Sequence, residues 1–409
     1  MEETKTYIFR NICSKIGSGA TPTGGKEAYK GGDTALVRSQ NVLDFSLTAD
    51  GLAYINDEQA KKLDNVTVEK NDVLLNITGD SVARVCLAPD WIIPARVNQH
   101  VAIIRGKQDT VLNQYLMYYL QYKKTQLLSL SQGGATRNAL TKKMIEEIEI
   151  TLPTLPRQKQ IVSILSALDS KIELNRRIND NLEQQAQALF KAWFVDNSNP
   201  NWEETSLSEV ASFVGGYSYT GEELTDCSNI AMATIKNFGR NGGFKADGFK
   251  EINPSAKLKE CHYANLFDIL VAHTDLTQNA DVIGNAELLL TYGKYNSIIF
   301  SMDLVKVLPK ETFPYRFLLA AMLKNKLFKG HSLGYVNGTT VLHLSKKALP
   351  DFEIRKPSDS ESKMMDEVLA SYYKRMAELL QENDKLISLR DTLIPKLMSG
   401  KLKINDLNC

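Results

Sequence analysis

The chain has 409 residues, of which 43% are hydrophobic and 24% are charged, and its formal net charge is +1. This length favours two or more domains, and the composition is typical of a soluble globular protein. No stretch approaches the roughly 20 uninterrupted apolar residues of a membrane span, and the acidic, polar start of the chain is not typical of a signal peptide. A membrane-inserted protein is therefore excluded, and any nucleic-acid-binding face must come from local clusters of basic residues.

The cysteines and histidines show no metal or disulfide pattern. The five cysteines are scattered without a CxxC pair, which argues against a zinc ribbon or a disulfide framework. The five histidines show no HxxxH pair or other metal spacing. The sequence therefore predicts no metal site and a protein of the reducing cytoplasm.

Residues 1–151 predict an α+β domain. Apolar, β-favouring runs alternate with turn-rich stretches, of which the glycine-rich residues 17–25 are the clearest. A second polar loop with glycines occupies residues 131–138. The predicted strands are 34–37, 72–77 and 100–104, and the predicted helix is 114–130.

Residues 152–196 predict one long helix, which Thr154 can cap. Alternating steps of four and three residues from Ile161 onward fall on apolar side chains, except at Asn175 and Asn179. One narrow apolar stripe on so long a helix needs a partner helix. At about 1.5 Å per residue the helix would extend roughly 60 Å, which is the length of a spacer.

The residues that follow repeat the plan of the first domain. A polar break at 197–201 ends the helix and opens a second domain that reaches residue 356. Residues 35–41 align with 231–237, which lie 196 positions later. Residues 134–153 align with 338–357 at a shift of 204 positions, with Leu-x-Lys-Lys and Glu-Ile in register. The sequence therefore predicts two domains of similar fold.

A second long helix follows the second domain, within residues 357–409. Ser358 and Glu361 form an S-x-x-E capping box at its start. The same stepping by fours and threes continues over residues 365–393, again shifted by 204 positions from the first helix. Pro395 predicts the end of this helix near Ile394, because a proline in a helix interior removes a hydrogen bond.

Two such helices can bury both stripes by packing against each other in antiparallel directions. Asn383 occupies the heptad position of Asn179, so we expect these two side chains to approach each other near the midpoint. With Asn175 they either fix the register at some cost in stability or are simply solvated where the stripe drifts. The predicted fold class is α+β: two similar domains, placed at opposite ends of a rod by two long helices that form an antiparallel coiled coil, in a pseudo-two-fold internal repeat.

The usual signatures of catalysis are missing. The chain has no Asn/Asp-Pro-Pro-Tyr/Phe element of adenine methyltransferases, and its Gly-Gly-Lys at 24–26 is not followed by the Ser or Thr of a Walker P-loop. Residues 350–355 loosely resemble a nuclease metal site, but they end in arginine where that pattern has lysine. An amphipathic strand is the simpler interpretation of this run. The sequence predicts no catalytic residues and a chain that is not an enzyme.

The remaining chemistry lies in polar loops of the two domains. Arginine reads guanine and glutamine or asparagine reads adenine at base edges, whereas lysine positions phosphates. Taken singly, each of these polar side chains more often belongs to a solvated loop. Their recurrence in both domains favours a protein that reads two different short DNA sequences. The candidate DNA-contacting residues are Arg38, Ser39, Gln40, Asn41, Thr78, Thr136, Arg137, Asn138, Lys142, Lys143, Lys236, Asn237, Arg240, Asn241, His273, Thr274, Asp275, Lys346 and Lys347.

With these residues in place, the chain resembles the specificity subunit of type I restriction-modification systems over essentially its whole length. The resemblance lies in the central residues 152–196 and in LRDTLIPKLMSGKL at 389–402, which are specific in combination. HTDLTQ at 273–278 and GATP at 19–22 add weaker support.

The resemblance implies two target-recognition domains, residues 1–151 and 197–356, that each bind one part of an asymmetric, bipartite double-stranded DNA target in the major groove. It implies that the helical spacers, residues 152–196 and 357–409, act as a ruler. The implied partners are two methyltransferase subunits and the restriction/translocase subunits. No cofactor is implied in this chain; S-adenosylmethionine belongs to the partner methyltransferase, and ATP and Mg²⁺ belong to the partner restriction subunit.

One difference between the two domains bears on this function. Val341, Leu342 and His343 stand where the first domain has Arg137, Asn138 and Ala139. The second loop is therefore less suited to reading a purine, and a phosphate contact by the following lysine pair is the better expectation there.

Two other functions are compatible with parts of the sequence. A coiled-coil scaffold whose repeated domains bind protein is the main alternative, which the near-neutral charge favours slightly and the repeated basic loops disfavour. A nuclease that uses the acids around Asp351 and Glu353 is a distant third.

Overall fold

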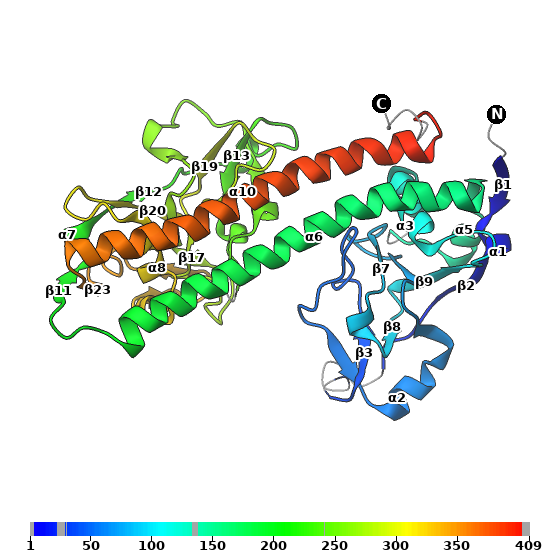
Figure 1. Cartoon of the computed structure of the whole chain (residues 1–409), viewed down its shortest axis with the longest axis horizontal. Helices are drawn as coiled ribbons and strands as arrows, with labels where there is room; N and C mark the ends of the chain where they lie inside the picture. The colour runs from blue at the N-terminus through cyan, green and yellow to red at the C-terminus, as the bar shows by residue number, and fades with distance from the viewer. Residues whose placement is uncertain (1–3, 23–28, 30, 133–137, 241, 403–409) are drawn as a thin grey trace. The chain divides into compact units, whose positions relative to one another are not determined.

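The computed structural model describes residues 4–22, 29, 31–132, 138–240 and 242–402. The chain divides into two compact units: unit 1 comprises Met1–Ser170 and Ile387–Cys409, and unit 2 comprises Lys171–Leu386. Each unit contains one mixed α/β domain and a segment of each of two long helices, α6 and α10 (Figure 1). Within the described residues, no helix combines the length and hydropathy that crossing a bilayer requires.

The domain of unit 1 is built on an antiparallel sheet in the order β2-β9-β6-β7 and a mixed sheet in the order β4-β3-β8-β5. In the mixed sheet, β3 and β8 run parallel. A ribbon of β1 and β10 joins the start of the domain to its end. The strands are β1 Thr4–Ile8, β2 Cys13–Ser18, β3 Thr34–Val37, β4 Ala53–Ile55, β5 Thr67–Val68, β6 Val73–Asn76, β7 Val85–Leu87, β8 Ala95–Val97, β9 Val101–Gly106 and β10 Glu149–Pro153.

Helices cover the antiparallel sheet of unit 1. The four residues of β6 are all buried, as expected of an apolar run in the middle of a sheet. The tyrosines and leucines of α3 pack on this sheet together with Ile161 and Leu165 of α6. The predicted helix at 114–130 is two helices, which are separated at Lys123. The helices of this domain are α1 Phe9–Ile12, α2 Asp57–Lys62, α3 Asn113–Tyr122, α4 Lys124–Ser131 and α5 Lys142–Glu146.

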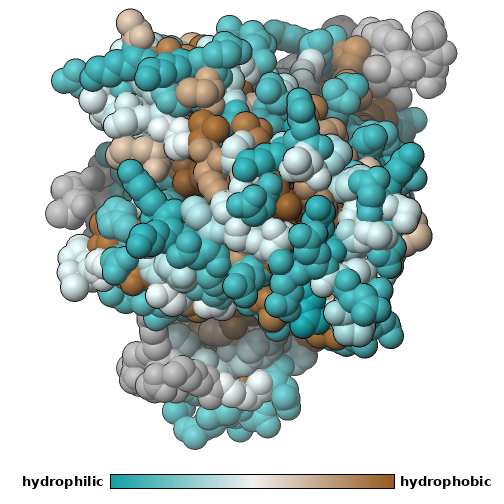
Figure 2. All heavy atoms as spheres, turned by 90° about the vertical axis from the view of Figure 1, so that its left-hand side faces the viewer, coloured by the Kyte–Doolittle hydropathy of each residue, from teal (hydrophilic) through white to brown (hydrophobic). Residues whose placement is uncertain are grey.

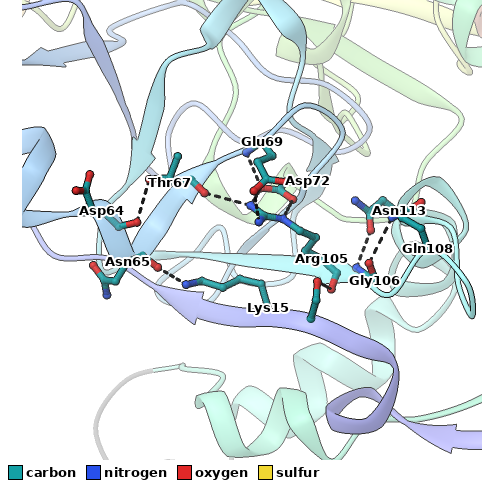
Figure 3. A network of polar contacts seen from close by, with 11 residues as sticks. Lys15, Asp64, Asn65, Thr67, Glu69, Asp72, Arg105, Gly106, Gln108 and Asn113 are labelled. Atoms are coloured by element: carbon teal, nitrogen blue, oxygen red, sulfur yellow. Dashed lines mark hydrogen bonds and ion pairs between the residues drawn. The ribbon is translucent and has the colours of Figure 1, made fainter.

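Buried charges fix the turn that precedes β6. Arg105 on β9 approaches Asp72 with Nε and Nη2, each 2.7 Å from a carboxylate oxygen, as Figure 3 shows. The same guanidinium group binds Glu69 and the carbonyl oxygen of Thr67, while Lys15 on β2 donates to the neighbouring segment (Figure 3). These cations satisfy groups of their own domain, so we do not count them among DNA-contacting residues.

The domain of unit 2 has the same strand order as that of unit 1. Its antiparallel sheet is β12-β20-β16-β18, and its mixed sheet is β14-β13-β19-β15, in which β13 and β19 run parallel. The predicted internal repeat is thus confirmed at the level of topology. The elements are β11 Glu203–Ser206, α7 Leu207–Val210, β12 Ala211–Gly215, β13 Ile230–Ala233, β14 Lys250–Glu251, β15 Tyr263–Ala264, β16 Ile269–Ala272, β17 Thr274–Asp275, β18 Ala286–Leu288, β19 Ser297–Phe300, β20 Leu304–Pro309, α8 Arg316–Leu323, α9 Lys326–Leu333, β21 Val336–Asn337, β22 Leu342–Leu344 and β23 Glu353–Lys356.

Of the two acids of the nuclease-like run, Glu353 opens the amphipathic strand β23 and Asp351 lies in the turn before it. Phe352 and Ile354 are buried, whereas Glu353 and Arg355 between and beyond them are exposed. β23 pairs with β11, so its alternation is that of a strand with one face on the core. No group of three or more potential metal ligands forms among the described residues.

The two long helices follow their predicted bounds with one exception. α6 spans Leu155–Lys191 and continues in a π-helical turn, Ala192–Asp196, before the predicted break. α10 spans Asp359–Met398, after the capping box of Ser358 and Glu361. The predicted end near Ile394 is wrong, because Pro395 is accommodated inside the last turns of α10. Gly400, with a φ of 72°, follows the true end.

The apolar stripes face each other within each unit. In unit 2, Ala186 and Phe190 of α6 share a core with Leu369 and Tyr373 of α10. Unit 1 brings Ile161 and Leu165 into the same core as Ile394 and Leu397. The hydrophobic periodicity therefore predicted Ile161, Leu165, Ala186 and Leu369 correctly, whereas the buried Phe190, Tyr373 and Ile394 each lie one residue after a predicted position.

The three asparagines of the stripe lie in unit 2 and show that the helix segments run antiparallel there. Nδ2 of Asn175 is 2.9 Å from Oδ1 of Asn383, and Nδ2 of Asn179 is 3.4 Å from the carbonyl oxygen of Met376. The predicted meeting of Asn179 and Asn383 is wrong by one turn. The shift of 204 positions aligns the helices in sequence, but packing pairs Asn383 with the residue one turn before its counterpart.

A hollow opens on the side of unit 2 where β11 and β23 lie. Figure 2 shows apolar side chains gathered between hydrophilic ones on this face. The cavity measures about 280 Å³, and its apolar lining includes Phe190 and Phe194 from the end of α6 and Phe352 beside β23. The rings of Phe190 and Phe194 are stacked with their centroids 4.8 Å apart.

Candidate nucleic-acid interface

Three turns of unit 1 meet at one end of its sheets. The turn after β3 is joined to the end of β8, because the backbone N–H of Asn98 donates to the carbonyl of Val37 at 3.1 Å. The segment after β6 joins the same place, since the N–H of Ile77 donates to the carbonyl of His100 at 3.0 Å. The sheet order therefore gathers residues that are far apart in sequence.

A chain of hydrogen-bonded side chains runs across these turns. Oγ1 of Thr78 lies 2.6 Å from Nδ1 of His100, and Nε2 of His100 lies 3.2 Å from Nε2 of Gln99. Oε1 of Gln99 accepts a hydrogen bond from Thr21. Gln99 is exposed, and Thr78 and His100 are half-buried, so this chain of polar groups reaches the surface.

The GATP motif is held against the same turns. The N–H of Gly19 donates to the carbonyl of Asn98 at 3.1 Å. A Cβ at position 19 would lie 1.8 Å from the carbonyl oxygen of Val97, so only glycine allows this approach. The motif therefore presents Thr21 to Gln99 because of a backbone requirement at Gly19.

Arg38 and Gln40 follow β3 in this cluster. Both side chains donate to the carbonyl oxygen of Gly51, Gln40 at 3.2 Å, and the guanidinium carbon of Arg38 lies 5.7 Å from the ring centre of Tyr29. Nε of Arg38 is buried without a hydrogen-bond partner among the described residues. Ser39 contributes its carbonyl, which accepts from Asn76 at 2.8 Å.

Asn41 does not face solvent. Its side chain is 0% exposed, its Oδ1 accepts from the N–H of Arg38 at 3.1 Å, and its Nδ2 donates to the carbonyl oxygens of Thr48 and Asp50. All of its amide groups are used to close the turn after β3. The structure therefore gives Asn41 a role in this turn, and a base contact by Asn41 stays a prediction.

Asn237 repeats this arrangement in unit 2. It is also 0% exposed; its Oδ1 accepts from the N–H of Thr234 at 2.9 Å, and its Nδ2 donates to the carbonyl of Lys245 at 2.8 Å. The recurrence of asparagine at this position therefore has a structural cause, and a DNA contact by Asn237 stays a prediction. Lys236 beside it is exposed and stays a candidate.

The loop before the paired lysines reaches the cluster of unit 1. Thr78 forms a β-bridge with Ala139, and the N–H of Gly79 donates to the carbonyl of Asn138 at 3.1 Å. Asn138 is exposed, whereas Thr136 and Arg137 lie outside the described residues. Lys142 and Lys143 open α5 and are exposed, at 3.6 and 4.0 Å from acids one turn later.

Unit 2 has the same framework at the matching positions. The N–H of Ser301 donates to the carbonyl of Ala233 at 2.9 Å, and that of His273 donates to the carbonyl of Asp303 at 2.8 Å. Oγ1 of Thr274 donates to Oδ1 of Asp303 at 2.9 Å. Thr274 and Asp303 thus occupy the places of Thr78 and His100.

Basic side chains surround this framework in unit 2. β17 pairs with β22, which places Thr274 opposite His343. Burial, and the nearby charges of His343 and Lys346, hold the pKa of His273 below its ordinary value despite the opposing charge of Asp303. His273 is therefore neutral at neutral pH, while Lys346 and Lys347 are exposed cations that follow β22, the strand that pairs with β17.

Asp275 has a structural role. Its side chain is 1% exposed, and its carboxylate accepts hydrogen bonds from the N–H groups of Thr277, Val282 and Ile283. Burial alone would raise the pKa of this carboxyl, but these hydrogen bonds outweigh burial and lower it. The carboxylate of Asp275 therefore orders the loop after β17, and a DNA contact by Asp275 stays a prediction.

A glycine-rich loop completes the candidate set in unit 2. Arg240 is exposed, and its Nε lies 3.6 Å from Asp281. Asn241 lies outside the described residues. The N–H of Gly243 donates to the buried carboxylate of Glu287 at 2.5 Å, which ties this loop to the edge of the antiparallel sheet.

The sequence argument did not single out Gln99, His100 or Asp303 as candidates, and it considered His343 only as the residue that stands where the first domain has Ala139. No local pattern joins His100 to Thr78. The internal repeat offered a signal. His343 falls 204 positions after Ala139, and Asp303 lies between β19 and β20 as His100 lies between β8 and β9.

Comparisons with known proteins agree with this architecture. The family model described as "Type I restriction modification DNA specificity domain" matches residues 1–184. The specificity subunit of the type I restriction enzyme HindI from Haemophilus influenzae is 24% identical, over 98% of this chain and 100% of its own length. The MjaIX specificity subunit from Methanocaldococcus jannaschii is 23% identical, over 96% of this chain and 92% of its own length.

A solved structure has the same fold. The crystal structure of the S subunit of a type I restriction-modification system from M. genitalium matches with a TM-score of 0.52 and 16% sequence identity. The match covers 97% of this chain and 96% of that chain. At this identity the likeness concerns the fold alone.

Proposed function

We propose that this chain is the sequence-specific DNA-binding subunit of a type I restriction-modification complex, because the family model for the DNA specificity domain matches residues 1–184 and the chain is similar to such specificity subunits over nearly its whole length. Each domain binds one part of an asymmetric, bipartite duplex target in the major groove, and the chain directs its partners to that target. It acts in the cytoplasm by binding and catalyses no reaction itself.

One observation carries this proposal: two hydrogen-bonded frameworks are alike in their backbone contacts and different in the side chains they present. The bonds Ile77–His100 and His273–Asp303 are 3.0 and 2.8 Å long, yet one framework carries an imidazole and the other a carboxylate. A protein that recognises two different half-sites needs the same backbone contacts in both domains with different side chains presented to the DNA. Base edges are distinguished by their hydrogen-bond donors and acceptors.

Exposed basic groups beside each framework support a DNA ligand. Lys142 and Lys143 adjoin the framework of unit 1, and Lys346 and Lys347 adjoin that of unit 2. Lysines at the margins of base-reading groups suit phosphate contacts, which position a protein on the duplex without reading its sequence. We assign the lysine pairs to phosphates and retain Arg38, Gln40 and Asn138 for base contacts.

The partners are two methyltransferase subunits, which bring S-adenosylmethionine, and restriction/translocase subunits, which bring ATP and Mg²⁺. The apolar hollow of unit 2, with Phe190 and Phe194 in its lining, supports a docking surface for a protein partner. The domains are residues 1–151 and 197–356, and residues 152–196 and 357–409 are spacers that set the gap between the half-sites.

Duplex binding by the assembled complex of this chain with its methyltransferase subunits tests the proposal. Selection from a randomised duplex library should return two different short sequences separated by a fixed gap. Affinity should fall steeply with salt, because phosphate contacts release counterions. A symmetric consensus, or binding that is independent of salt and sequence, would contradict the proposal and favour a scaffold that binds protein.

The role of the helices is tested by adding seven residues, one heptad, at matched places in α6 and α10. The gap between the half-sites should change, while the half-sites themselves stay the same. An unchanged gap would contradict the ruler but leave DNA recognition by the two domains intact.

A further inference from the structure

The two frameworks differ in the direction of one hydrogen bond, and this difference predicts what each reads. In unit 2, the hydroxyl of Thr274 donates to Oδ1 of Asp303, since an ionised carboxylate can only accept. Oδ2 of Asp303 has no hydrogen-bond partner among the described residues. This framework therefore presents an acceptor.

In unit 1 the direction is reversed. Oε1 of Gln99 accepts from Thr21, so the NH₂ group of Gln99 faces His100 and donates to its Nε2 at 3.2 Å. A neutral imidazole whose Nε2 accepts carries its proton on Nδ1. Nδ1 of His100 then donates to Oγ1 of Thr78 at 2.6 Å, and the hydroxyl proton of Thr78 is free to donate elsewhere.

The backbone around the two pairs is matched, which makes the comparison meaningful. The N–H of His100 donates to Oδ1 of Asn98 at 3.0 Å, and the N–H of Asp303 donates to Oγ of Ser301 at 3.3 Å. Thr78 bridges Ala139, and Thr274 pairs with His343, so each threonine faces the loop that precedes a lysine pair. The backbone contacts are thus kept, while the presented hydrogen-bonding group changes from imidazole to carboxylate.

We propose that His100 and Asp303 are specificity-determining residues at equivalent positions, and that they give the two half-sites opposite hydrogen-bonding character. The pair of unit 1 offers the Thr78 hydroxyl as a donor to an acceptor-bearing base edge, guanine or thymine. The pair of unit 2 offers the Asp303 carboxylate as an acceptor to a base amino group, that of cytosine or adenine. This inference rests on the proposed function and deepens it.

The charge of Asp303 fits this role. A carboxylate near duplex DNA repels phosphates, so its presence beside Lys346 is useful where it accepts a hydrogen bond from a base amino group. The Lys346 cation offsets this repulsion, since Lys346 and Asp303 both act on His273.

The test compares duplex selection by the assembled complex carrying the wild-type chain, Asp303→Asn or His100→Asp. Asp303→Asn keeps the shape but adds a donor, so one position of one half-site should lose roughly tenfold in its preference for a base with an amino group. His100→Asp should reverse the preference at one position of the other half-site. In each variant the remaining half-site and the gap should stay unchanged.

Asp226→Asn provides the matched control, since Asp226 is an exposed acid before β13, at the opposite end of that strand from Ala233. The complex carrying Asp226→Asn should select the same consensus as the wild type. The thermal unfolding midpoints should agree among the folded variants. If Asp303→Asn and His100→Asp both retain the wild-type consensus, or if either alters both half-sites, the inference is wrong. A wild-type complex that selects no sequence would instead contradict the proposed function.

Discussion

Asn175 and Asn383 form a side-chain hydrogen bond of 2.9 Å in the helix pair of unit 2, where both are buried. Nδ2 of Asn175 also donates to Glu382 at 2.9 Å, and Nδ2 of Asn383 donates to the carbonyl of Ile172 at 3.3 Å. Oδ1 of Asn175 has no partner among the described residues. A buried amide pair in an apolar seam specifies the register of the helices at a cost in stability.

Asn383→Ala should lower the free energy of unfolding by about 1–3 kcal/mol, because it removes one of the two acceptors of the buried Nδ2 of Asn175. The double variant Asn175→Leu with Asn383→Leu should be nearly neutral or more stable, since both polar groups are replaced together. Urea unfolding of the wild type, both single leucine variants and the double variant measures this coupling. A double variant that loses the sum of the two single losses would show that the amides do not act as a pair.

Arg390 should be a major contributor to stability in unit 1. It is 7% exposed; its Nη1 lies 2.9 Å from Asp169, and its guanidinium carbon lies 3.5 Å from the ring centre of Phe45. Arg390→Met should cost about 1.5–3 kcal/mol, the range for hydrogen bonds to charged groups. Arg375→Met, which removes an exposed pair with Glu378, should change stability by less than about 0.5 kcal/mol. Equal losses in chemical denaturation would contradict this ranking.

Lys324 is the centre of a buried charge cluster in unit 2. Its Nζ binds Glu287 on β18 and lies 3.3 Å from Glu183 on α6, and all three side chains are at most 14% exposed. Lys324→Met should destabilise the chain by about 3–5 kcal/mol, because two carboxylates would remain buried without a cation. Lys326→Met removes an exposed lysine two residues later and serves as the control. A thermal midpoint equal to that of the control would disprove the role of Lys324.

The sequence correctly predicted elements that are determined by residues close to one another in the chain. The apolar run of β6 and the capping box of Ser358 and Glu361 depend on neighbours within a few residues, and both are present as expected. The end of α10 was predicted wrongly at Pro395, because a proline near the end of a helix costs few hydrogen bonds. The packing of Ile394 and Leu397 outweighs that cost.

The interface was harder to predict because its contacts are not local. Asn41 and Asn237 have the residue type that reads adenine, but each is turned into its own loop, which only the backbone geometry reveals. Conversely, Thr78 and His100 meet because the antiparallel sheet pairs the end of β6 with the start of β9, and no spacing in the sequence encodes that contact.

Glu223 should make stability depend on acid pH. Hydrogen bonds from the hydroxyl of Tyr217 and from the N–H groups of Thr220 and Ser255 lower the pKa of this carboxyl from 4.5 to about 2. A lowered pKa in the folded state stabilises the fold above about pH 4.5, and this contribution is lost as the pH falls through 4.5 toward 2. The thermal midpoint of the wild type should therefore fall toward that of Glu223→Gln over this range. Glu222→Gln, at an exposed neighbouring acid, should leave the wild-type pH profile unchanged.

Lys346 should contribute to DNA binding through a phosphate rather than a base. It is exposed, and it adjoins the framework of Thr274 and Asp303. Lys346→Gln should weaken binding of specific and non-specific duplexes by a similar factor and reduce the slope of log affinity against log salt by about 0.9. Lys326→Gln, on α9, should leave the slope unchanged. Titration of both duplexes at several salt concentrations measures the slope, and a loss confined to the specific duplex would instead assign Lys346 to a base contact.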